Sequence, residues 1–185
     1  MIKSARSFLV TIENKTNTVI FVNNNSTMVE IYTDGSSKGN PGPGGYGVVM
    51  LANGHRKELS KGFRLTTNNR MELMAVIAGL EVLKKQDLKI TIYSDSKYVV
   101  ESVQKGWVYQ WDMKSDFAKK KNRDLWKKFL KIAQYQDITF SWVKGHSTNK
   151  ENCRCDELAT EAADGYELET DDGYEKEMKN KKGMF

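Results

Sequence analysis

Residues 28–47, MVEIYTDGSSKGNPGPGGYG, decide the fold class because a strand pattern changes there into a long glycine-rich stretch. The residues from Met28 to Thr33 alternate between apolar and polar side chains, as a half-buried strand does. We expect residues 35–45 to form a loop, because glycine and proline at this density favour neither helix nor strand. The stretch therefore predicts a strand with one acidic residue, Asp34, at its end.

The chain that follows alternates between strand and helix patterns. Residues 46–51 and 56–64 indicate two strands, and Asn53-Gly54 between them is typical of a tight hairpin turn. Further strands are expected at 89–94 and 137–143, and helices at 69–83, 96–105, within 107–121, at 122–134 and at 151–163. This order predicts an α/β fold in which helices cover the faces of a mixed sheet.

Two regions flank this main domain of residues 28–163. Residues 1–27 contain two strand patterns, SFLVTIE at 7–13 and TVIFV at 18–22, and then a polar linker, so we expect an N-terminal β-hairpin extension. Residues 164–185 are rich in Asp, Glu, Lys and Gly, and we expect this charged tail to be disordered.

The charge of the chain favours an anionic partner. The net charge is +5 and the isoelectric point about 9.0. Residues 105–131 alone carry nine Lys/Arg against three Asp, and the aromatic side chains among them include Trp107. Such mixing suits phosphate neutralisation with stacking on bases or sugars. The alternative is a solvated helix face whose aromatic side chains lie in the core.

Cysteine content and hydropathy limit the other classes of function. The two cysteines are spaced C-x-C without a second pair, which favours neither a zinc site nor a disulfide framework. We therefore expect a cytoplasmic protein. No apolar run approaches the roughly 20 residues of a membrane span, so no membrane partner is expected.

Four acidic residues stand where strands or loops meet helices: Asp34, Glu72, Asp95 and Asp156. Such positions can converge at the carboxyl edge of a sheet, where α/β sites form. Carboxylate oxygens select Mg²⁺ or Mn²⁺. In a basic chain, such a cluster predicts chemistry on a phosphodiester backbone.

Each acid also has a local explanation. Asp34 precedes Gly-Ser, as turn residues do. Glu72 stands three residues after Asn69, which is a capping-box spacing. Asp95 could cap a helix, and Asp156 could lie in a first helical turn, where the helix dipole favours an acid. The joint pattern of all four favours the cluster.

His146, in the loop sequence WVKGHST, is a candidate proton carrier. A neutral imidazole near a metal site can move a proton at neutral pH. The alternative is an inert loop histidine.

Around these residues the sequence resembles type I ribonuclease H, the ribonuclease HI family, over about residues 28–163. The similarity rests on long motifs in the family's order, and we expect it to extend to Asp172-Gly173-Tyr174 in the tail. The motifs are TDGSSKGNPGPGGYG, TTNNRMELMA, SDSKYV, NRDLW and WVKGH…ENCRCDELA.

The resemblance implies a ribonuclease H-like fold with a mixed five-stranded sheet flanked by helices. It implies an endoribonuclease that hydrolyses the RNA strand of RNA–DNA hybrids and leaves 3′-hydroxyl and 5′-phosphate ends. It also implies two Mg²⁺ ions, which Mn²⁺ can replace, and a monomeric enzyme. The catalytic residues would be Asp34, Glu72, Asp95, His146 and Asp156, of which the four acids would hold the metal.

The resemblance also implies how the substrate is held. Ribose 2′-hydroxyls would contact the loop 35–40, with Gly35, Ser36 and Ser37, together with Asn68 and Glu72. Phosphates would contact Asn40, Thr67, Arg70 and Asn122. Trp107 and the lysines after it would form a basic handle that grips the hybrid.

Three alternatives remain from the sequence. The first is another nuclease of the same fold, of mobile-element or resolvase type, although such proteins generally lack the NPGPGGYG and TTNNRMEL motifs. The second is a non-catalytic hybrid-binding or duplex-RNA-binding protein, which would be expected to have lost an acid. The third is a DNA-binding protein without chemistry, which explains the charge and leaves the four acids unexplained.

Overall fold

The computed structural model describes residues 8–12, 18–22, 28–113, 120–145 and 148–182. Its centre is a five-stranded sheet in the order β5-β4-β3-β6-β7. β3 pairs antiparallel with β4 and parallel with β6, so the sheet is mixed, as predicted. The strands are β3 (Met28–Ser37), β4 (Gly42–Ala52), β5 (His55–Thr66), β6 (Lys89–Ser94) and β7 (Asp137–Trp142).

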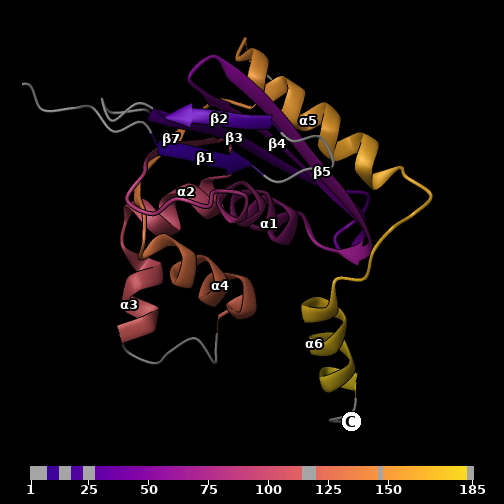
Figure 1. Ribbon diagram of the computed structural model, residues 1–185. Helices are drawn as coiled ribbons and strands as arrows, with labels where there is room; N and C mark the ends of the chain where they lie inside the picture. The colour runs from indigo at the N-terminus through magenta and orange to yellow at the C-terminus, as the bar shows by residue number, and fades with distance from the viewer. Residues whose placement is uncertain (1–7, 13–17, 23–27, 114–119, 146–147, 183–185) are drawn as a thin grey trace, which may run out of the picture.

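Helices cover both faces of this sheet (Figure 1). α5 (Lys150–Ala163) lies on one face. The opposite face carries α1 (Asn68–Glu81), α2 (Lys97–Gln104), α3 (Trp107–Met113) and α4 (Arg123–Ala133). Within the described ranges, no helix combines the length and the apolar character that a membrane crossing requires.

The core has two layers because β4 directs alternate side chains to opposite faces. Val48 and Met50 belong to the larger cluster with the helices α1, α2 and α4. Val49 between them packs against Cys155 and Leu158 of α5. This period-two alternation explains how one apolar run serves both layers.

The glycine-rich stretch is mostly strand, so the expected loop over residues 35–45 is wrong. β3 continues to Ser37 and β4 begins at Gly42, and the two strands stay paired over that length. The glycines are explained by packing, since β4 runs directly beneath α5. A Cβ atom on Gly45 or Gly47 would overlap backbone carbonyls of α5. Absent side chains therefore let the helix approach the strand closely.

The two predicted hairpins are present. Asn53 and Gly54 have φ values of 51° and 77°, which a type I′ turn requires at both central positions. Near the N-terminus, β1 (Phe8–Ile12) pairs antiparallel with β2 (Thr18–Val22). The division of the chain at residue 27 stays a prediction.

The C-terminal segment is ordered, so its expected disorder is wrong as far as Lys182. Glu169 forms a bridge with Phe63 of β5, and α6 (Asp172–Lys182) follows. Arg64 donates to Glu175 with two hydrogen bonds of 2.8 Å. Composition alone suggested disorder because the acids were counted as solvated, whereas the side chain of one of them, Asp171, is only 1% exposed.

Candidate active site

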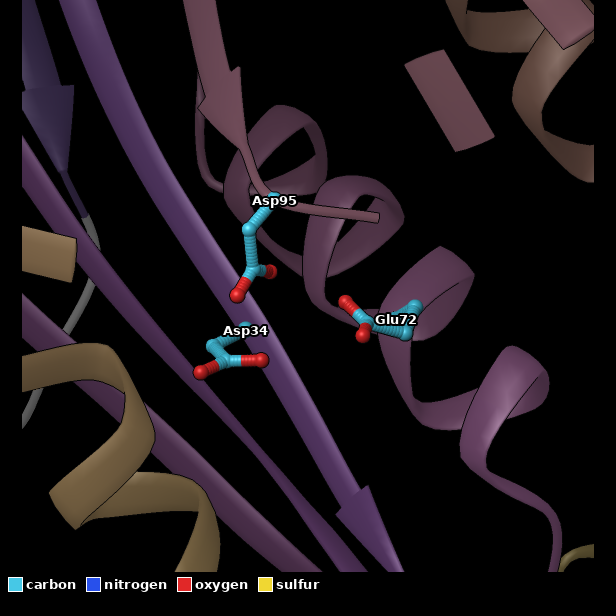
Figure 2. Close-up of side chains that lie close together, drawn as sticks. All are labelled: Asp34, Glu72 and Asp95. Carbon is cyan, nitrogen blue, oxygen red and sulfur yellow. The ribbon is translucent and has the colours of Figure 1, made fainter. Parts of the chain in front are cut away.

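Three of the four predicted acids lie together at one end of the sheet (Figure 2). Asp34 belongs to β3, Glu72 to α1, and Asp95 follows β6 directly. One carboxylate oxygen from each of them lies within 4.8 Å of the other two. The parallel pairing of β3 with β6, which places Thr33 beside Ser94, brings Asp34 and Asp95 to the same edge. The sequence predicted that four acids converge, and the structure brings three of them into one group.

Gly35 brings α1 close enough for Glu72 to join the cluster. A Cβ atom at Gly35 would overlap the backbone of Met71 and Glu72. The helix can therefore lie almost in contact with the strand, and any larger residue would push it away. Asp34 and Glu72 face each other across this close contact (Figure 2).

Asp156, on α5, does not belong to the group of three. The residue is half-buried. Its negative charge is among the causes that raise the pKa of Asp34. The four acids thus come from the interior of β3, from the residue after β6, and from two helices on opposite faces of the sheet.

The local explanations for the four acids fail. Asp34 stands inside β3, paired with Gly47, instead of in a turn. The N-cap of α1 is Thr67, so Glu72 does not stand in a capping box. The N-cap of α2 is Ser96 and not Asp95, and Asp156 lies beyond the first turn of α5, which begins at Lys150.

Burial and mutual repulsion make the cluster unfavourable when all its members are ionised. Burial raises the pKa of Asp34 to about 7, followed in weight by the charge of Asp95, although the Gly35 N–H, 2.7 Å from Oδ1, opposes the shift. Burial also raises the pKa of Glu72 well above its ordinary value, with Asp34 as the next cause. A divalent cation would reverse both effects by supplying the missing positive charge.

The donor set fits such a cation. Glu72 Oε2 is buried and has no hydrogen-bond partner among the described residues. Its other oxygen, Oε1, accepts a 3.4 Å hydrogen bond from Asn68 Nδ2. An unsatisfied buried carboxylate oxygen is costly unless a ligand completes it. The arrangement is therefore suited to hard metal ions held by oxygen.

Two of the predicted substrate contacts, Gly35 and Asn68, donate hydrogen bonds to acids of the cluster, and three others line a separate pocket. A pocket of about 260 Å³ is lined by three of the four predicted phosphate ligands, Asn40, Thr67 and Asn122. The Asn68 backbone N–H donates to Asn40 Oδ1 at 3.3 Å, which ties the pocket to the first turn of α1. Gly35 is buried in β3, and Ser36 and Ser37 are half-buried at its end.

Arg70 was predicted to bind phosphate, and the structure contradicts this. Its side chain is 1% exposed and lies between two acids. Two hydrogen bonds of 2.9 and 2.7 Å reach Asp124, and two of 2.6 and 2.7 Å reach Asp171. The guanidinium is neutralised inside the protein and does not face a ligand.

The basic region 105–131 has features of both interpretations, since some of its aromatic side chains lie in the core and others are exposed beside lysines. Trp126 is fully buried in the core. Trp107 remains 41% exposed, with the Lys105 ammonium 4.9 Å from its ring centroid, and the Lys120 ammonium lies 5.3 Å from that of Trp111. An exposed tryptophan flanked by lysines suits a nucleic-acid contact.

His146 lies outside the described residues, so its place relative to the acids stays a prediction. What the sequence did not reveal is the role of Asp124 and Asp171 as partners of Arg70. The signals were the motif NRDLW, which contains Asp124, and the tail motif Asp172-Gly173-Tyr174, which continued the family resemblance into a segment expected to be disordered.

Comparison with known proteins decides the family. The RNase H family model matches residues 26–164. The chain belongs to the ribonuclease H family. A ribonuclease H of Syntrophus aciditrophicus strain SB is 54% identical over 150 residues, which cover 79% of this chain and 86% of the relative. Ribonucleases H are metal-dependent endoribonucleases that act on RNA–DNA hybrids, and this chain is an enzyme of that kind.

Solved structures of ribonucleases H have the same fold. LC9-RNase H1, a type 1 enzyme with the type 2 active-site motif, is 29% identical, with a TM-score of 0.66 over 75% of this chain and 72% of its own. LC11-RNase H1, solved in complex with an RNA/DNA hybrid, is 32% identical, with a TM-score of 0.56 over 74% of this chain and 96% of its own. The ribonuclease H fold predicted from the motifs is therefore confirmed.

Proposed function

We propose that this ribonuclease H cleaves the RNA strand with two Mg²⁺ ions, which Mn²⁺ can replace, and leaves 3′-hydroxyl and 5′-phosphate ends. The observation that carries the proposal is the group of three carboxylates, of which Asp34 and Glu72 are buried and Asp95 is half-buried, with oxygens that lie within 4.8 Å of one another. Asp34, Glu72, Asp95 and Asp156 would hold the metal. Metal ions held by these residues would supply activation of the attacking water and stabilisation of the leaving 3′-oxygen.

The remaining proton transfer is assigned to His146. An imidazole titrates near neutral pH and can carry a proton between solvent and the reacting phosphate. The position of this residue in the sequence, after β7 and before α5, supports the assignment. Asp156 follows on α5, and its negative charge contributes to the raised pKa of Asp34.

The RNA strand would be recognised through its 2′-hydroxyls. Ser36, Ser37 and Asn68 offer hydroxyl and amide groups, and the buried Gly35 lets α1 bring Asn68 and Glu72 close to β3. Only RNA carries the 2′-hydroxyl, so contacts of this kind separate it from DNA. Asn40, Thr67 and Asn122 would bind backbone phosphate in the pocket of about 260 Å³.

A single chain supplies all the proposed ligands, which supports a monomeric enzyme. The two cysteines, Cys153 and Cys155, form no disulfide. Reduced thiols are typical of a reducing compartment, so we place the enzyme in the cytoplasm.

The decisive assay is Mg²⁺-dependent cleavage of an end-labelled RNA–DNA hybrid beside single-stranded RNA, duplex RNA and duplex DNA. We expect cleavage of the hybrid alone. Asp34→Asn should abolish cleavage and leave hybrid binding largely intact, because it removes a metal ligand and no phosphate contact. Turnover by this variant within about tenfold of the parent would contradict the metal assignment, and cleavage of duplex DNA would favour a mobile-element or resolvase nuclease.

A further inference from the structure

The C-terminal helix forms one wall of the pocket that contains the proposed phosphate ligands. Opposite Asn40 and Asn122, the wall is made by three residues of α6: Tyr174, Glu177 and Met178. Neither the family match, which ends at residue 164, nor the four acids account for this wall. The pocket is therefore incomplete without a segment that the catalytic chemistry does not use.

A buried ion pair fastens this segment to α1. The Asp171 carboxylate accepts from Arg70 Nε at 2.6 Å and from Arg70 Nη2 at 2.7 Å, and both side chains are 1% exposed. Thr66 Oγ1 donates to the same carboxylate at 2.7 Å, and the Tyr174 N–H does so at 3.2 Å. Four donors thus hold one carboxylate directly before α6 begins.

The other side of Arg70 reaches the opposite edge of the pocket. It donates to Asp124 of α4, two residues after the pocket residue Asn122. Arg70 itself stands three residues after Thr67, which also lines the pocket. One guanidinium therefore sets the spacing between α1, α4 and α6, the three helices around the pocket.

Gly173 allows α6 to rest directly on this ion pair. A Cβ atom there would overlap Asp124 Oδ2 and meet Arg70 Nη2 at 2.8 Å. Alanine is otherwise favoured over glycine in a helix by about 1 kcal/mol. Glycine at this position is explained by the close contact with the Arg70–Asp124 pair.

We propose that α6 is a substrate-binding element of this enzyme, and that Asp171 is a positioning residue that holds α6 and the first turn of α1 around one backbone phosphate of the bound hybrid. The inference rests on the proposed function, in which the pocket binds phosphate. It adds that Glu177, an acid in the pocket wall, weakens the binding of that phosphate. Asp171 therefore strengthens hybrid binding, whereas Glu177 weakens it.

The test uses the full-length enzyme and hybrids in which one phosphate at a time is replaced by a neutral methylphosphonate. Dissociation constants are measured by fluorescence anisotropy in EDTA, so that metal-dependent cleavage does not occur. With the parent enzyme, a methylphosphonate at one or two adjacent positions should weaken hybrid binding by about tenfold, as expected for lost hydrogen bonds to a charged group. All other positions should cost much less.

The variants should change how much affinity is lost when the sensitive phosphate is replaced by a methylphosphonate. Asp171→Asn should weaken binding of the unmodified hybrid by about tenfold and remove the extra loss at the sensitive position, since the phosphate contact is already broken. Gly173→Ala should do the same by displacing α6. Glu177→Gln should bind the unmodified hybrid about two- to fivefold more tightly, because a like charge beside the phosphate is removed. Glu167→Gln, the same charge change at an exposed residue outside the pocket, is the matched control.

Three results would overturn the inference. If Asp171→Asn and Gly173→Ala bind more weakly but retain the sensitive position, they act only on stability. If Glu177→Gln binds no more tightly than Glu167→Gln, α6 does not face the phosphate. If the parent enzyme cleaves hybrids but has no sensitive position, the pocket does not bind phosphate, and the proposed phosphate contacts fail together with this inference.

Discussion

At the scale of single residues, Asp34 links the stability of the protein to pH. Its folded-state pKa of about 7 lies above the value of 3.8 for an unperturbed aspartate. The folded protein therefore retains this proton more strongly than the unfolded chain, and stability falls as the pH rises between these two values. The raised pKa of Glu72 acts in the same direction.

We expect the melting temperature in EDTA to fall more between pH 5 and pH 8 for the parent enzyme than for Asp34→Asn. The variant cannot ionise at this position, and it relieves the repulsion on its neighbours. Adding Mg²⁺ at pH 8 should restore more stability to the parent, because binding to the folded state alone stabilises it. If calorimetry gives the same pH dependence of the melting temperature for both proteins, Asp34 is not the group that links stability to pH.

His146 has a smaller predicted effect than the acids. We expect His146→Ala to slow turnover by roughly 10- to 1,000-fold, the usual contribution of general acid–base catalysis. The measurement is single-turnover cleavage of the hybrid across a pH series, with exogenous imidazole as a rescue agent. Complete loss of activity would indicate a ligand or structural role, and unchanged activity would show that the histidine is inert.

At the scale of elements, the handle around α3 should contribute electrostatic affinity. Each phosphate contact adds about −0.9 to the slope of log affinity against log salt. Changing Lys119, Lys120 and Lys121 to Ala should therefore raise KM, flatten the salt dependence and leave kcat nearly unchanged. A control with Lys84, Lys127 and Lys131 changed to Ala removes the same charge elsewhere on the surface. Equal slopes for the two variants would show that the handle does not reach the backbone.

The elements also show how far the sequence could be interpreted. Periodicity predicted the strands and helices of the main domain because their apolar faces contact the core. The strand structure of residues 35–37 and 42–45 could not be predicted from local composition, since Gly35 is required by the approach of α1 and Gly45 by that of α5, and neither by a turn. The acids were found because four of them recur at element ends. The partners of Arg70 were missed because no local pattern signals a contact across 101 residues.

At the scale of the whole molecule, the N-terminal hairpin should be dispensable for catalysis. A chain that begins at Met28 keeps the complete sheet and all four acids. Because a two-stranded hairpin is not stable alone, we expect the hairpin to pack on the domain away from the acids. The shortened protein should lose some thermal stability and keep its specific activity at low temperature. A folded protein with weakened hybrid affinity would instead make residues 1–27 a substrate-binding element.

The span of the Arg70–Asp171 pair has a consequence for the synthesis of the enzyme. Residue 171 must have left the ribosome before the buried guanidinium meets its second acid, 101 residues after Arg70 was made. Until then a nascent chain carries α1 with a buried positive charge that is only partly compensated, a costly state. The catalytic domain should therefore complete its folding only after the segment that carries Asp171 has emerged. A nascent chain stalled before Asp171 should be digested by protease more readily than one stalled after residue 182 has emerged.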